Sequence, residues 1–128
     1  MSGSVYSVLV VDDNRMDRLK MIHALNAGDY NIYEAAGGRE AMEMLRSQNF
    51  HLVLLDVLMP EINGFQVLEE MQSDQLLAKI PVVMVSAIDE QEDVKKFFAM
   101  GAVEFITKSL DAESLRKCVD SNLENAPD

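Results

Sequence analysis

The chain has 128 residues, of which 48% are apolar, enough to build one domain with a single sizeable core. Its 22 acidic and 11 basic residues give a net charge of -11, which repels nucleic acid and membrane surfaces and argues against direct DNA binding by this chain. The one cysteine, Cys118, cannot form an internal disulfide and is expected in the core, and the absence of a signal-peptide pattern predicts a cytoplasmic protein.

Short apolar runs alternate five times with longer segments of helical period. The apolar runs predict strands at residues 5–11, 31–34, 51–55, 81–85 and 103–106. The periodic segments predict helices at residues 15–26, 39–47, 65–73, 90–100 and 112–123. The first, third and fourth runs are nearly continuous, which indicates strands buried on both faces. We therefore expect one α/β domain over residues 1–128, a doubly wound parallel sheet of five strands.

The fourth predicted helix has clear start and stop signals. Asp89 is a candidate N-cap, and Gly101 suits the residue just after the helix. Val94, Phe97 and Phe98 are expected to form a stripe that faces the core.

Polar residues follow four of the five predicted strands. They are Asp12 and Asp13 after the first, Asp56 after the third, Ser86 after the fourth and Lys108 two residues beyond the fifth. Each alone has a structural explanation, such as a helix cap, a turn or a solvated lysine. Because ligand sites in parallel sheets lie outside the carboxyl ends of the strands, we expect these side chains to converge on one edge.

The chemistry of this set points to a metal ion and a phosphoryl group. Three neighbouring carboxylates raise one another's pKa unless a cation neutralises them. Oxygen ligands without histidine or cysteine favour Mg²⁺, with Mn²⁺ as a substitute. With the cation bound, Asp56 could attack phosphorus while Lys108 balances the charge on the phosphoryl oxygens and Ser86 donates a hydrogen bond to one of them.

Four ordered motifs make this chain resemble a known family. They are Val-Val-Asp-Asp at 10–13, Leu-Leu-Asp-Val-Leu-Met-Pro-Glu-Ile-Asn-Gly at 54–64, Val-Ser-Ala at 85–87 and Gly-Ala-Val-Glu-Phe-Ile-Thr-Lys at 101–108. Over essentially its whole length the chain resembles the receiver domains of bacterial two-component response regulators. The resemblance implies a flavodoxin-like (βα)5 fold with strand order 2-1-3-4-5.

The resemblance also implies a function and a set of ligands. It implies a phosphorylation-dependent switch, not an enzyme with an external substrate, that takes a phosphoryl group from a sensor histidine kinase or a histidine phosphotransfer protein onto Asp56. Asp13, Asp56 and the backbone carbonyl of Leu58 are implied to bind Mg²⁺ directly, and Asp12 through water. Ser86 and Lys108 are implied to sense the phosphate.

A signal-transmitting surface is implied as well. Phe105 resembles the aromatic residue that changes rotamer when Ser86 is drawn toward the phosphate. The fourth helix, fifth strand and fifth helix then form the output face, which binds an output domain or an effector protein and could support a homodimer on phosphorylation.

Two features of this chain modify the resemblance. The family usually has proline after the lysine, often with a cis bond before it, whereas Ser109 follows Lys108 here. Since a cis bond before a residue other than proline costs about 2.5–4 kcal/mol, we predict a trans bond between them. Leu58 and Ile88 are apolar where a polar side chain could position attacking water, which predicts slow self-dephosphorylation.

Two other readings compete with a phosphorylated switch. One is a receiver that only docks to another protein and no longer takes phosphate. The other is an enzyme or cofactor carrier on a similar sheet, but the chain has no Gly-rich nucleotide loop, no hydroxyl-rich flavin loop after the first strand and no Asp-x-Asp phosphatase motif there.

Overall fold

The computed structural model describes residues 6–26, 28, 30–87 and 91–124. Its strands are β1 (Tyr6–Val11), β2 (Tyr30–Ala35), β3 (Leu52–Asp56), β4 (Val82–Ser86) and β5 (Glu104–Thr107). All pairings are parallel, and the order across the sheet is β2-β1-β3-β4-β5, as implied by the resemblance. The doubly wound α/β fold is therefore confirmed.

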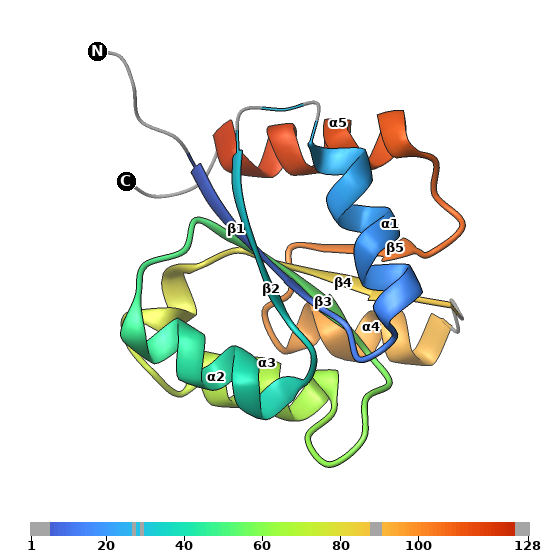
Figure 1. Cartoon of the computed structure of the whole chain (residues 1–128). Coiled ribbons are helices and arrows are strands. Elements are labelled where there is room, and N and C mark those ends of the chain that lie inside the picture. Colours follow the sequence, from blue (N-terminus) through green and yellow to red (C-terminus); the bar gives the residue numbers. More distant parts are fainter. Residues whose placement is uncertain (1–5, 27, 29, 88–90, 125–128) are drawn as a thin grey trace.

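Helices cover both faces of this sheet (Figure 1). They are α1 (Arg15–Leu25), α2 (Gly38–Ser47), α3 (Gly64–Gln72), α4 (Gln91–Ala99) and α5 (Ala112–Glu124), with a short 3-10 helix, η1 (Leu77–Lys79), before β4. Helices α1 and α5 pack on one face, and α2, α3 and α4 on the other. Side chains alternate along each strand, so Val8 and Val10 face α1 and α5 while Leu9 and Val11 face the opposite layer.

Strands β3 and β4 end one residue later than the sequence predicts. Asp56 pairs with Val85, and Ser86 pairs with Thr107, so Asp56 and Ser86 are the last residues of their strands. The parallel ladder holds both backbones, which fixes where the two polar side chains leave the sheet.

The end of α4 confirms one prediction and corrects another. Gly101 has a φ of 107°, a conformation that favours glycine, and the Ala102 N–H donates to the Phe97 carbonyl over 3.0 Å. Phe97 is fully buried, but Phe98 is 47% exposed, so its predicted place in the core-facing stripe is wrong. Successive helical residues point about 100° apart, and Phe97 takes the central position. The predicted cap, Asp89, lies outside the described residues.

Cys118 lies half-buried against the apolar layer under α1 and α5. Burial raises the pKa of its thiol to about 11, so the thiol stays protonated at neutral pH.

Within the described ranges no helix combines the length and apolar character that a membrane span requires.

Candidate functional site

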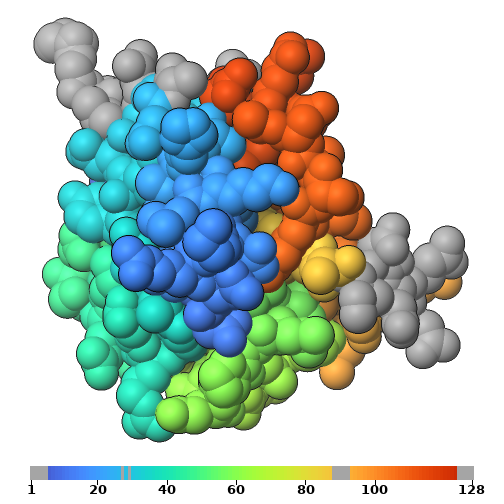
Figure 2. Space-filling view, turned by 45° about the vertical axis from the view of Figure 1, so that its right-hand side comes forward, coloured from blue at the N-terminus to red at the C-terminus, as the bar shows by residue number. Residues whose placement is uncertain are grey.

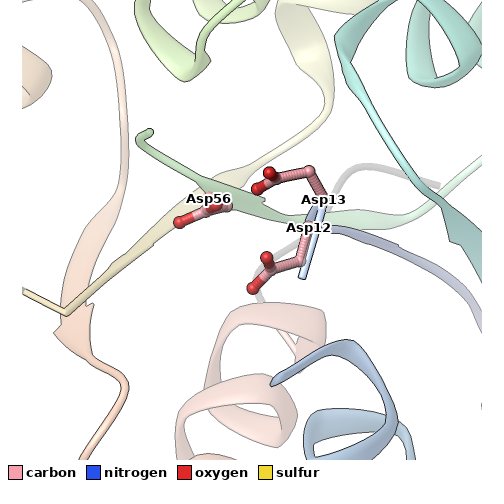
Figure 3. A group of neighbouring side chains, drawn as sticks. All are labelled: Asp12, Asp13 and Asp56. Carbon is pink, nitrogen blue, oxygen red and sulfur yellow. The ribbon is translucent and has the colours of Figure 1, made fainter. Parts of the chain in front are cut away.

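Three carboxylates converge at the carboxyl edge of the sheet, as predicted (Figure 3). Asp12 and Asp13 directly follow β1, and Asp56 ends the neighbouring strand β3. One oxygen from each carboxylate lies within 4.8 Å of the other two. Asp12 and Asp56 are buried, whereas Asp13 is exposed. The arrangement follows from topology, because adjacent parallel strands end at the same edge.

Lys108 enters the same site from the loop after β5. Its Nζ lies 2.9 Å from Asp12 Oδ2, 2.9 Å from Asp17 Oδ2 and 3.3 Å from Asp56 Oδ1. The backbone holds this lysine in place, since its N–H donates to the Ser86 carbonyl over 2.8 Å. The side chain is 19% exposed, so Lys108 is not a solvated surface cation.

The loop that carries Lys108 has Ser109 as its next residue. No cis peptide bond occurs in the described part of the chain, so the bond between Lys108 and Ser109 is trans, as predicted. The hydroxyl groups of Thr107 and Ser109 lie 2.8 Å apart and share a hydrogen bond across the lysine.

Ser86 and Phe105 occupy the two positions expected for a readout. Ser86 is 4% exposed and ends β4, next to the strand that carries Asp56. Phe105 is half-buried in β5, with its ring centroid 5.7 Å from that of Phe97. The coupled movement of Ser86 and Phe105 stays a prediction.

Leu58 is 66% exposed two residues after Asp56. Ile88, the other apolar residue expected near the phosphate, lies outside the described residues.

Gly64 allows helix α3 to begin directly against the end of β3. A Cβ atom at this position would lie 2.4 Å from the Asp56 carbonyl oxygen, closer than real Cβ contacts allow. The Gly64 N–H donates to the Val57 carbonyl over 2.9 Å. Asn63 and Gln66 form a reciprocal capping box that starts the helix. The backbone around Asp56 is thus enclosed on the side of α3.

The electrostatics of the site reflect crowded anions. Burial and then the charge of Asp12 raise the pKa of Asp56 to about 7, although Lys108 works in the opposite direction. Burial lowers the pKa of Lys108, but the hydrogen bonds and charges of Asp17, Asp12 and Asp56 outweigh burial and raise the pKa overall. Repulsion between carboxylates has the predicted direction, and desolvation is the larger cause.

The residues fit a hard cation. Asp12 Oδ2 is buried, and its ion-pair partner among the described residues is Lys108 Nζ, 2.9 Å away. That single ammonium is shared with Asp17 and Asp56, so a cation among the buried carboxylates would lower the cost of their burial further. The cluster offers carboxylate oxygens, the ligands that Mg²⁺ prefers.

The sequence interpretation missed two residues of α1. Asp17 is not one of the three clustered carboxylates, but its carboxylate accepts a hydrogen bond from Lys108 Nζ. Arg18 donates to the backbone carbonyl of Asp12 over 2.8 Å and pairs with Glu34 over 2.6 Å. A signal was available, because the first turn of the helix that follows Asp12 and Asp13 must begin at this edge.

One cavity lies close to the acid cluster, and another lies far from it. The first, of about 260 Å³, is mainly apolar and lies between α1 and α5, whose side chains share one face of the molecule (Figure 2). Lys108 and Ile106 are among its walls. The second, of about 610 Å³, lies at the opposite edge of the sheet, near His51 and Pro81. The three carboxylates line neither cavity.

Comparisons with known proteins agree with this geometry. The family model described as the response regulator receiver domain matches residues 8–120. PilH of Pseudomonas aeruginosa is 29% identical over 116 residues, which are 91% of this chain and 96% of PilH. ZraR of Escherichia coli is 35% identical over 124 residues, which are 96% of this chain but 27% of ZraR. The structure of the phosphorylated cyanobacterial phytochrome response regulator RcpA is 28% identical, with a TM-score of 0.81, covering 92% of this chain and 91% of that one.

Proposed function

Because the chain belongs to the response regulator receiver domain family, we propose that it is a switch that accepts a phosphoryl group on Asp56. Receiver domains interact with histidine kinases or phosphotransfer proteins, and we propose a partner of either kind as the donor. The observation that carries this proposal is the meeting of three carboxylates and Lys108 at one edge of the sheet.

In the proposed reaction Asp56 is the nucleophile. One of its carboxylate oxygens forms the new bond to phosphorus as the bond between phosphorus and the donor breaks. Lys108 Nζ, now 3.3 Å from Asp56 Oδ1, would pair with a phosphoryl oxygen, and the Ser86 hydroxyl would donate to another. Neutralising this charge inside a buried site is the main catalytic task.

Mg²⁺ would be held by Asp13, Asp56 and the backbone carbonyl of Leu58, and by Asp12 through water, with Mn²⁺ as a possible substitute. When bound, the cation supplies positive charge that keeps Asp56 ionised and balances the phosphoryl oxygens. The three converging carboxylates, which share the single ammonium of Lys108, support this assignment.

We further propose that Ser86 and Phe105 pass the change to the face formed by α4, β5 and α5. Phe105 lies beside Phe97, whose ring stacks on that of Phe65 at 3.9 Å, so a rotamer change would disturb α3 and α4. The face would bind an output domain or an effector protein, or a second copy after phosphorylation. Residues 1–128 would form one regulatory domain, and a cytoplasmic location stays a prediction.

The proposal is tested by intact-mass spectrometry after incubation with acetyl phosphate and Mg²⁺. We expect one phosphoryl adduct on the wild type, none on Asp56→Asn and an unchanged adduct on Asp74→Asn, an exposed aspartate at the opposite edge. Excess EDTA should suppress the adduct. A wild type that takes no adduct, or an undiminished adduct on Asp56→Asn, would favour a receiver that only docks.

A slow decay of the phosphorylated state is a second part of the proposal. The exposed side chain of Leu58 has no polar atom with which to orient attacking water. We expect Leu58→Asn to shorten the half-life of the adduct, measured by loss of the phosphoryl mass after the donor is removed. A variant that decays more slowly than the wild type would contradict this.

A further inference from the structure

In the part of the chain that the structure describes, Asp17 is the one ion-pair partner of Lys108 that lies outside the acid cluster. Its Oδ2 accepts a hydrogen bond from Lys108 Nζ over 2.9 Å, whereas Asp56 Oδ1 is 3.3 Å from the same atom. The ammonium therefore sits closer to Asp17 than to the proposed phosphoryl acceptor. With three N–H donors, it can be shared among several anions, and their relative strengths decide its position.

The local structure of α1 fixes where the Asp17 carboxylate lies. Asn14 caps the helix, and its side chain accepts the Asp17 N–H over 3.0 Å. The Asn14 N–H in turn donates to Asp12 Oδ1 over 2.9 Å. Asp17 is thus anchored to the same turn that carries the acid cluster, and its carboxylate approaches Lys108 from the α1 side.

A cation in the cluster would leave Asp17 in contact with the lysine. The carboxylates close enough to share an ion are Asp12, Asp13 and Asp56, and Asp17 is not among them. Positive charge placed among those three weakens their hold on Lys108 but does not neutralise Asp17. Asp17 then becomes the main anionic competitor for the ammonium.

We propose that Asp17 is a positioning residue that holds the Lys108 ammonium in the unphosphorylated protein and opposes its transfer to a phosphoryl oxygen on Asp56. This inference rests on the proposed function. The Asp17 side chain is 39% exposed, and ion pairs open to water are weak. Asp17 therefore sets how readily the phosphorylated state forms and does not block it.

The test uses beryllofluoride, a phosphoryl mimic, titrated into the protein at saturating Mg²⁺. Because the chain has no tryptophan, binding is followed by fluorine NMR. We expect Asp17→Asn to bind beryllofluoride about two- to fivefold more tightly than the wild type, the range that an exposed ion pair allows. Asp17→Glu, which restores the charge, should bring the affinity back toward the wild-type value.

Two controls separate positioning of Lys108 from a general effect of charge. Glu43→Gln on α2 removes the same charge from an exposed site and should leave the affinity unchanged. In a Lys108→Ala background, adding Asp17→Asn should give no further gain. An equal gain in that background would overturn the inference.

The outcomes also separate this inference from the function on which it rests. A wild type that does not bind beryllofluoride would contradict both. A wild type that binds it, with unchanged or weaker binding by Asp17→Asn, would overturn only the role of Asp17.

Discussion

The two edges of the sheet differ in what they bury, although the same five strands reach both. Asp12, Asp56 and Ser86, the buried polar side chains among the described residues, all lie at the carboxyl edge. At the amino edge, His51 packs edge-on against Tyr6 and accepts the Ser7 N–H, and its surroundings are open to a large cavity. Among the described residues, carboxylates are therefore buried at the carboxyl edge and not at the amino edge. Because burying a charge costs free energy, a function is expected at the edge where the protein does so.

The largest effect on stability should come from removing the ammonium group of Lys108 at the carboxyl edge. Lys108→Ala leaves Asp12 and Asp56 buried without their ammonium, and we expect it to lower the free energy of unfolding by about 3 kcal/mol. Lys79→Ala, at an exposed lysine of the amino edge, should change it by about 0.5 kcal/mol or less. Urea unfolding in EDTA measures both. Equal effects would remove the contrast between the edges.

The pH dependence of stability should show the same contrast at a comparable size. The pKa of Asp56 is about 7 in the folded protein and near 3.8 when unfolded, so between these values the folded state binds more protons. The free energy of unfolding contributed by Asp56 must then fall as pH rises from about 4 to about 7, by about 3 kcal/mol. Asp56→Asn should lack this fall in metal-free urea titrations. Parallel pH profiles for the two proteins would show that Asp56 ionises normally.

A steric test of the carboxyl edge should give the smallest effect. Gly64→Ala places a Cβ against the Asp56 carbonyl, which cannot move out of the strand ladder, and should cost about 1–2 kcal/mol. At Gly37, a Cβ meets nothing within 4 Å, so Gly37→Ala is the matched control and should cost about 0.5 kcal/mol or less. Thermal unfolding of both variants decides this. A Gly64→Ala protein as stable as its control would mean that α3 can shift away from β3.

The meeting of the carboxylates could be predicted because it depends on topology. Once strands and helices alternate, Asp12, Asp13 and Asp56 must leave parallel strands at one edge, and no side-chain detail is needed. The aspartates directly follow apolar runs, so their positions at the strand ends could be read from the sequence.

The pairing of Asp17 with Lys108 and the exposure of Phe98 could not be predicted in the same way. The role of Asp17 depends on the path of the flexible Lys108 side chain, which comes from the far end of the sequence. Phe98 follows Phe97, and the apolar pattern alone does not decide which of two adjacent aromatic rings faces the sheet. Strands β3 and β4 end one residue later than predicted because the hydrogen-bonded ladder between β3, β4 and β5 extends through Asp56 and Ser86.

The close approach of Gly64 to the Asp56 carbonyl bears on how related sequences should be read. Asp56 and Gly64 are eight positions apart, and the first residue dictates chemistry while the second dictates whether the loop between them can close. A chain that keeps the aspartates but carries a larger residue at the glycine position should not be assumed to share this site. The glycine therefore belongs to the sequence pattern of this site for a steric reason. A search or a design that scores only the charged residues would overlook it.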